Sequence, residues 1–168
     1  MSTFYWIHGL PGAGKTTTGK LLHKYMIEKE LKVILLDGDE IRDLFESYDY
    51  TVCGRDKMME KTLRLVSMLL SQENDVILCN CAMENKYRKM CEECSPNLKE
   101  IYLDVSIEEL IRRDQKQLYS KALNGEIENV RGINMAYDVP ENPELVVKND
   151  SELSAGQVVD IIIKSFCI

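Results

Sequence analysis

The residues best suited to chemistry form a glycine-rich run that ends in lysine and threonine. The run reads G-x-x-x-x-G-K-T and lies between a β-branched and aromatic segment, 3–7, and an amphipathic segment, 15–30. Its residues are Gly9, Leu10, Pro11, Gly12, Ala13, Gly14, Lys15 and Thr16, with Thr17 next. Glycines let backbone N–H groups surround a phosphate, and a helix N-terminus attracts an anion. Lys15 can span the β- and γ-phosphates, and the Thr16 hydroxyl can bind Mg²⁺. This phosphate loop (residues 9–17) therefore predicts a site for ATP and Mg²⁺.

A loop of this kind needs an acid that holds the metal or takes a proton. The apolar segment 75–80 ends without a carboxylate, whereas the segment 32–36 is followed by Asp37-Gly38-Asp39. In an open α/β sheet the carboxyl ends of the strands face the ligand crevice. We therefore predict that Asp39 is catalytic. Asp37 either contributes to the site or only shapes an Asp-Gly turn.

Basic residues that could bind an anionic substrate lie in three places. Arg42 comes three residues after Asp39, and Arg55 opens the amphipathic segment 55–72. Either could neutralise an anion, although a lone arginine is more often a solvated surface residue. The third place is the polar stretch 115–143, which carries Lys116, Lys121 and Arg131. A long loop in a compact domain is usually a lid or disordered, and these bases favour a lid that excludes water.

Short apolar segments alternate with longer amphipathic ones along the chain. Strands are predicted at 3–7, 32–36, 75–80, 100–105 and 144–147, and helices at 15–30, 40–45, 55–72, 85–94, from Ser106 and from Ser154. This alternation predicts an α/β fold, with a parallel sheet of about five strands and helices on both faces. With the phosphate loop after the first strand and the basic stretch 115–143 as a lid, the fold is expected to be of the P-loop NTPase type. The length predicts one domain, residues 1–168, with the lid at about 115–143.

Composition excludes several classes of function. The 168 residues include 21 basic and 28 acidic side chains, and the net charge of −7 argues against binding to duplex DNA or to anionic membranes. The longest apolar runs are too short to cross a bilayer. Six cysteines without an export signal predict reduced thiols and a cytoplasmic protein. Their irregular spacing favours ordinary helix and strand-end cysteines over a zinc site.

Two other classes compete with a small-molecule kinase. A regulatory GTPase would need Asn-Lys-x-Asp, but the one Asn-Lys pair, Asn85-Lys86, is not followed by that acid. A non-catalytic nucleotide-binding module would need neither Asp39, nor Arg42, nor a basic lid. A kinase needs all three, so we favour a kinase with a small-molecule substrate and keep the binding or regulatory protein as the alternative.

Taken together, these motifs resemble the adenylylsulfate (APS) kinases. The shared patterns are the phosphate loop, L-D-G-D-x-I-R at 36–42, a helix-opening arginine at Arg55, R-D-x-K-x-L-Y-x-K-A at 113–122, G-E-I at 125–127 and G-I-N at 132–134. The resemblance implies transfer of the ATP γ-phosphoryl group to the 3′-hydroxyl of a ribonucleotide that bears an anionic tail. It also implies that Asp39 positions Mg²⁺ or accepts the hydroxyl proton, and that Lys15 assists the transfer.

The same resemblance assigns residues to the two substrates. Arg113 joins the phosphate loop in the ATP site, whereas the acceptor site takes Asp37, Arg42, Tyr50, Arg55, Lys121 and Ile133. Tyr50 matches one of two aromatic residues that clamp the adenine in the family. Family members are often dimers, which makes a homodimer an expectation here.

Three positions depart from the family pattern, all on the acceptor side. Met58 replaces an asparagine, Val130 replaces the second clamping aromatic, and the segment Cys81–Asn85 replaces a serine-proline pair. Relatives of the family in capsule phosphoramidate biosynthesis share its size and motifs and phosphorylate cytidine diphosphoramidate. The resemblance therefore leaves two acceptors open, adenylylsulfate and cytidine diphosphoramidate.

Overall fold

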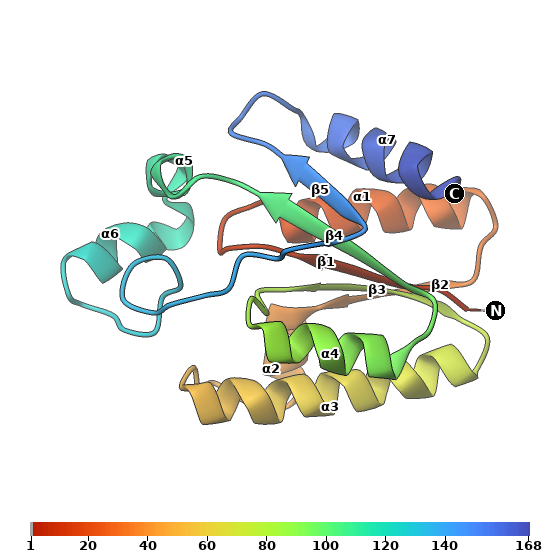
Figure 1. Ribbon diagram of the computed structural model, residues 1–168, viewed down its shortest axis with the longest axis horizontal. Coiled ribbons are helices and arrows are strands. Elements are labelled where there is room, and N and C mark those ends of the chain that lie inside the picture. Colours follow the sequence, from red (N-terminus) through yellow and green to blue (C-terminus); the bar gives the residue numbers. More distant parts are fainter. Residues whose placement is uncertain (1) are drawn as a thin grey trace.

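The computed structural model describes residues 2–168 and contains a five-stranded sheet (Figure 1). Its strands are β1 (Phe4–His8), β2 (Val33–Asp37), β3 (Asp75–Asn80), β4 (Leu98–Asp104) and β5 (Leu145–Lys148), in the order β2-β3-β1-β4-β5. Every neighbouring pair is parallel, as predicted. All five strands therefore end at the same edge of the sheet, which is the edge where the phosphate loop and Asp37 lie.

Helices cover both faces of the sheet, which confirms the three-layer prediction. Helices α1 (Lys15–Glu28) and α7 (Ala155–Phe166) pack on one face, and α3 (Val52–Ser71) and α4 (Asn85–Cys94) lie on the other (Figure 1). The short helix α2 (Gly38–Leu44) follows β2 directly. Helices α5 (Ile107–Arg113) and α6 (Leu118–Leu123) extend beyond the carboxyl edge of the sheet, at the left of Figure 1.

Alternation of side chains along β1 divides the core into two clusters. Tyr5 and Ile7 pack with the buried residues of α1 and α7, whereas Phe4 and Trp6 pack with those of α3 and α4. All five residues of β1 are buried, as expected for the central strand of a parallel sheet covered on both faces. The strand that leads into the phosphate loop is therefore held from both sides.

Side-chain caps explain why two helices begin earlier than the sequence pattern predicts. The Asp37 carboxylate accepts a hydrogen bond from the Asp39 N–H, so α2 begins at Gly38 rather than at residue 40. Thr51 caps α3 in the same way through the Gly54 N–H, so α3 begins at Val52 rather than at Arg55. In both cases an oxygen-bearing side chain satisfies a free N–H of the first turn. Arg55 thus lies within the first turn of α3 instead of opening it.

Ser106 and Ser154, where two helices are predicted to start, are N-caps with different partners. Ser154 and Gln157 form a reciprocal capping box at the start of α7. Ser106 caps α5 by accepting from the Glu109 N–H, but its own N–H donates to Asp150. The Glu109 carboxylate instead binds arginines of α5. The two N-caps therefore differ, because α7 has a reciprocal capping box whereas the Glu109 side chain does not return a bond to Ser106.

The polar stretch 115–143 contains structure that its composition does not predict. A 3₁₀ turn at Gln115–Gln117 leads into α6. Tyr119 of α6 is 1% exposed, and its hydroxyl donates to the Pro11 carbonyl over 2.8 Å. The helix has only six residues, too few for a helical period to stand out in the sequence. Through Tyr119, the first part of this stretch packs directly on the phosphate loop.

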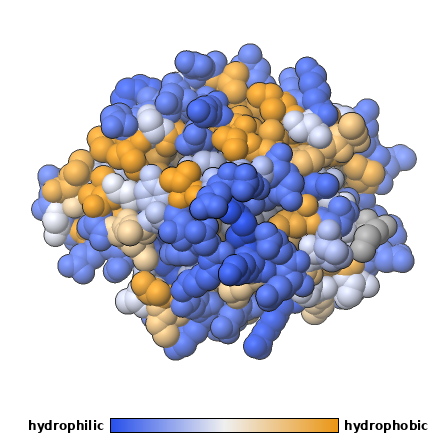
Figure 2. Space-filling model, viewed as in Figure 1, coloured by the Kyte–Doolittle hydropathy of each residue, from blue (hydrophilic) through white to orange (hydrophobic). Residues whose placement is uncertain are grey.

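The surface is mainly hydrophilic in the lower part of the face shown in Figure 2, over α3 and α4, with hydrophobic residues gathered toward its upper part. Among residues 2–168 no helix is both long enough and apolar enough to cross a membrane. All six cysteines are free thiols. Cys91 and Cys94 lie on α4 and Cys79 lies in β3, in keeping with ordinary helix and strand cysteines.

Candidate nucleotide-binding and phosphoryl-transfer site

The phosphate loop turns tightly between β1 and α1, and all three of its glycines have a positive φ. Gly14, the residue just before α1, has a φ of 96°. This is the left-handed region, where any other side chain would strain the backbone. A Cβ on Gly9 would approach the Leu103 carbonyl oxygen to 2.7 Å. The loop therefore follows a path that leaves its backbone N–H groups at the N-terminus of α1, where an anion binds well.

Two side chains of the phosphate loop have defined partners. The Lys15 amine donates to the Leu10 carbonyl over 2.8 Å, across the loop. The Thr16 hydroxyl donates to Asp37 Oδ2 over 2.5 Å, although β3 separates β1 from β2 in the sheet. Asp37 is buried, and its other oxygen caps α2. A threonine hydroxyl and a carboxylate in contact are hard oxygen ligands of the kind that Mg²⁺ takes.

Asp39 lies two residues further on, in the first turn of α2, in a different environment. Its carboxylate is 75% exposed, and its nearest cation is the Lys116 amine at 3.6 Å. The two acids of Asp37-Gly38-Asp39 are therefore unlike each other. Asp37 bonds both to the first turn of α2 and to Thr16 of the phosphate loop. The carboxylate of Asp39 is exposed and can bind a ligand.

Three side chains from the α2–α3 region form an acceptor-side cluster: Arg42, Tyr50 and Arg55. The guanidinium groups of Arg42 and Arg55 lie 4.6 and 5.5 Å from the centre of the Tyr50 ring. Arg42 also donates to the Ser47 carbonyl, and Arg55 Nε donates to the Tyr50 carbonyl. Burial lowers the pKa of Arg55, and repulsion from Arg131 and Arg42 lowers it further. Such gathered positive charge favours an anionic partner.

Two other predicted bases, Arg113 and Lys121, have partners or positions outside this cluster. Arg113 lies beside the phosphate loop, where it donates to the Gly12 and Asn149 carbonyls and pairs with Glu109. Lys121 is exposed on α6, and Ile133 is half-buried against the core. The bases assigned to the two substrates therefore do not form a single cluster. Lys15 is part of the phosphate loop and Arg113 contacts it from α5, whereas Arg42 and Arg55 lie in the acceptor-side cluster.

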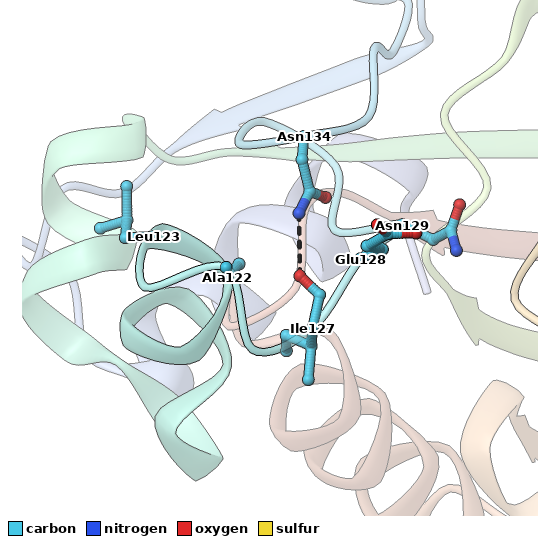
Figure 3. Close-up of a pocket in the computed structure, with 7 residues that line it drawn as sticks. Ala122, Leu123, Ile127, Glu128, Asn129 and Asn134 are labelled. Carbon is cyan, nitrogen blue, oxygen red and sulfur yellow. Dashed lines mark hydrogen bonds between the residues drawn. The ribbon is translucent and has the colours of Figure 1, made fainter.

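A hollow of about 500 Å³ opens within the lid, between α6 and the following loop (Figure 3). It is lined by Ala122, Leu123, Gly125, Ile127, Glu128, Asn129 and Asn134. The Asn134 side chain donates to the Ile127 carbonyl over 2.9 Å and joins the two ends of this loop. No residue of the phosphate loop lines the hollow, but the Asn129 carbonyl accepts a hydrogen bond from Arg55. The hollow therefore borders the acceptor-side cluster rather than the triphosphate site.

A buried histidine next to the phosphate loop is a feature that the sequence pattern did not single out. His8 ends β1, is 1% exposed and lies between the rings of Trp6 and Tyr102. Its Nε2 lies 2.9 Å from Glu100 Oε1, and Arg88 donates to the same carboxylate. Burial lowers the pKa of His8 and outweighs the opposing attraction of Glu100. Burial raises the pKa of Glu100, but the close contact with the His8 ring and the hydrogen bonds from Arg88 outweigh it and bring that pKa below its ordinary value.

This environment predicts a loss of stability at mildly acidic pH. The unfolded chain protonates His8 below about pH 6.5, whereas the folded chain resists until a lower pH. Between these two pKa values the unfolded state binds the extra proton, so the free energy of unfolding falls as the pH falls. We expect His8→Gln to flatten this dependence between pH 7.5 and 5.5 in urea unfolding. His23→Gln removes the other histidine and serves as the control; equal flattening in both variants would contradict the assignment.

Comparison with known proteins agrees with the geometry. A family model described as adenylylsulphate kinase matches residues 1–148. A cytidine diphosphoramidate kinase from Campylobacter jejuni is 38% identical over 163 residues, which is 97% of this chain and 95% of that protein. A probable adenylyl-sulfate kinase from Aeropyrum pernix is 38% identical over 152 residues, covering 87% of this chain and 82% of its own length.

The fold matches in the same way. The structure of a Mycobacterium tuberculosis APS kinase in complex with AMPPNP and APS superposes with a TM-score of 0.92, and the match covers 99% of this chain and 98% of that one. Its sequence is 24% identical to this chain, so this match supports the fold assignment alone. Because the family model and two relatives each cover most of the chain, and the P-loop NTPase fold agrees, the chain belongs to the adenylylsulphate kinase family of nucleotide kinases.

Proposed function

We propose that this kinase transfers the γ-phosphoryl group of ATP to the 3′-hydroxyl of a ribonucleotide with an anionic tail, with cytidine diphosphoramidate as the first candidate acceptor and adenylylsulfate as the second. The observation that carries the proposal is the pairing of two parts at one edge of the sheet. The phosphate loop, linked through Thr16 to Asp37, adjoins the cluster that contains Arg42 and Arg55. A donor triphosphate and an anionic acceptor each have a matching set of groups.

On the donor side, the proposed roles follow from charge and position. The backbone of the phosphate loop binds the β-phosphate, and the Lys15 amine leaves the Leu10 carbonyl to neutralise charge on the transferred group. Thr16 with Asp37 or Asp39 would hold Mg²⁺, which supplies charge neutralisation between the β- and γ-phosphates when bound. These few oxygen ligands suit Mg²⁺, because it usually keeps several waters and needs no full protein cage. Arg113, beside the Gly12 carbonyl, would support the ATP site.

On the acceptor side, Arg42 and Arg55 would hold the anionic tail, and the exposed ring of Tyr50 would stack on the base. Val130 is buried in the core and offers no aromatic face opposite Tyr50. A single stacking partner supports a smaller base, as does the similarity to the Campylobacter jejuni cytidine diphosphoramidate kinase. The exposed Asp39 carboxylate would accept the 3′-hydroxyl proton or position the metal.

The proposal includes the organisation of the protein. Residues 1–168 would act as one kinase domain, and about 115–143 as a lid in which Lys121 and Ile133 approach the acceptor and exclude water. The hydrogen bond from Tyr119 to the Pro11 carbonyl supports a lid that is in direct contact with the phosphate loop. Six free thiols support a cytoplasmic setting. A homodimer is proposed on family resemblance alone.

The test is an acceptor assay with the purified protein, ATP and Mg²⁺, in which ADP release is followed with each nucleotide. We expect turnover of cytidine diphosphoramidate, slower or no turnover of adenylylsulfate, and none of a 3′-deoxy analogue of the preferred acceptor. Efficient use of adenylylsulfate alone would reverse the order of the two acceptors. Turnover of neither, in a folded protein that binds ATP, would overturn the proposed function.

A further inference from the structure

Arg131 is a charged side chain in an unusual place. It is 1% exposed, and a buried guanidinium is costly unless its N–H groups are paired. Its Nη2 donates to both carboxylate oxygens of Glu84, over 2.6 and 2.7 Å, and its Nη1 donates to the Cys81 carbonyl over 2.7 Å. Its Nε has no hydrogen-bond partner among residues 2–168. Three charge-assisted hydrogen bonds thus tie the lid to the segment that follows β3.

This ion pair joins two of the three departures, the segment Cys81–Asn85 and the segment that contains Val130. Glu84 belongs to the segment Cys81–Asn85, and Arg131 is the residue after Val130. Glu84 and Arg131 are 47 positions apart in the sequence. Further bonds join the same two segments, from the Asp138 N–H to the Met83 carbonyl and from the Asn85 N–H to the Asp138 carboxylate. These two departures therefore lie in one region of contact, where hydrogen bonds and an ion pair hold the later half of the lid against the segment that follows β3.

The fastened segment in turn holds Arg55. Arg55 Nη2 donates to the Asn129 carbonyl over 2.8 Å, two residues before Arg131. Between them Val130 is buried, and its carbonyl accepts from the N–H groups of residues 133–135, so the backbone here is a compact turn. A displacement of Arg131 would therefore move the Asn129 carbonyl and change the direction of the Arg55 guanidinium.

We infer that Glu84 and Arg131 are positioning residues that orient Arg55 for the anionic tail of the acceptor. This inference rests on the proposed function. Glu84 also offsets the positive charge of Arg131 close to Arg55, so that three arginines, Arg42, Arg55 and Arg131, can lie near one another without an acceptor bound. The pair acts on acceptor affinity and leaves ATP affinity unaffected, because Lys15 and Arg113 do not contact it.

The first test is the Arg131→Met variant, which keeps an unbranched apolar chain and leaves the Glu84 carboxylate, 20% exposed, able to reach water. We expect the KM for the acceptor to rise at least about tenfold, as for loss of an oriented charged hydrogen bond. The KM for ATP is expected to stay within about twofold. Arg88→Met is the matched control, because it breaks another arginine–glutamate pair, with buried Glu100, outside the acceptor-side cluster. Arg88→Met should lower thermal stability, but it should not raise the KM for the acceptor relative to the KM for ATP.

A double-mutant cycle tests whether Arg131 acts through Arg55. In an Arg55→Ala background, Arg131→Met is expected to have little further effect on the acceptor KM, since the group it orients is gone. Additive effects, an equal rise in both KM values, or an unchanged acceptor KM in folded Arg131→Met protein would each overturn the inference while the wild type remains active. A wild type that turns over neither nucleotide would overturn the proposed function and this inference with it.

Discussion

Replacing Lys15 by alanine is expected to lower kcat by about 10²–10³-fold, the usual cost of removing one preorganised group that stabilises transition-state charge. The physical reason is that Lys15 is the cation carried by the phosphate loop itself. Its amine already lies over the loop, 2.8 Å from the Leu10 carbonyl, so little rearrangement is needed when the triphosphate enters. Folding loses only that one hydrogen bond, worth about 1 kcal/mol. The measurements are kcat with saturating ATP and acceptor, and urea unfolding of the same variant.

Lys20→Ala is the matched control for this prediction. Lys20 lies on the same helix, α1, and its amine pairs only with exposed Glu40 at 3.7 Å. Exposed pairs of this kind contribute little, so activity and stability should both remain near those of the wild type. If Lys15→Ala kept wild-type turnover and ATP affinity, the phosphate loop would not be the donor site.

The second large effect is expected from Asp39→Asn, which should lower kcat at least about a hundredfold, within the usual range for a general base. The amide keeps the shape of the side chain but can neither accept the 3′-hydroxyl proton nor offer a charged metal ligand. The carboxylate is 75% exposed and, among residues 2–168, its one ion pair is with exposed Lys116, so the fold should be unaffected. Steady-state kinetics with circular dichroism of the variant would check both statements.

Two comparisons separate this role from its neighbours. Glu40→Gln removes the next acid along α2, which is also exposed, and should leave kcat unchanged. Asp37→Ala removes the cap of α2 and the partner of Thr16 together, so it should cost about 1 kcal/mol of stability as well as activity. Near-normal turnover in Asp39→Asn, with a large loss in Asp37→Ala, would assign the catalytic acid to Asp37 instead.

Much of the fold was accessible from sequence because its signals are local. The central strand, the helix at 85–94 and the strand at 75–80 follow from apolar period and flanking residues, and the structure places the last two at the predicted bounds. The starts of α2 and α3 were predicted too late, because Asp37 and Thr51 extend the helices beyond their apolar pattern. Helix α6 was missed, because its six residues follow a polar turn and its anchor, Tyr119, is buried by contact with the distant phosphate loop.

The contiguous motifs identified the ligand class even in an acidic chain. The net charge of −7 says little about a phosphate ligand, because a glycine-rich turn before a helix and an Asp-Gly-Asp at a strand end carry their chemistry within a few residues. By itself, then, the sequence determined the α/β class, the phosphate loop and the kinase resemblance. It also located the departures at Met58, Val130 and Cys81–Asn85, though not what they do together.

Tertiary structure alone decided the pairings. Thr16 meets Asp37 rather than Asp39, Arg113 meets the Gly12 carbonyl of the phosphate loop, and Arg131 meets Glu84. Arg55 reaches the Asn129 carbonyl across 74 positions of sequence. The physical reason is that such contacts depend on the order in which parallel strands are added to the sheet and on the path of the loops between them. Helix and strand propensities and the spacing of apolar residues give neither the strand order nor the loop paths. The residues that act together can therefore be identified only once the fold brings the carboxyl ends of the strands to one edge of the sheet.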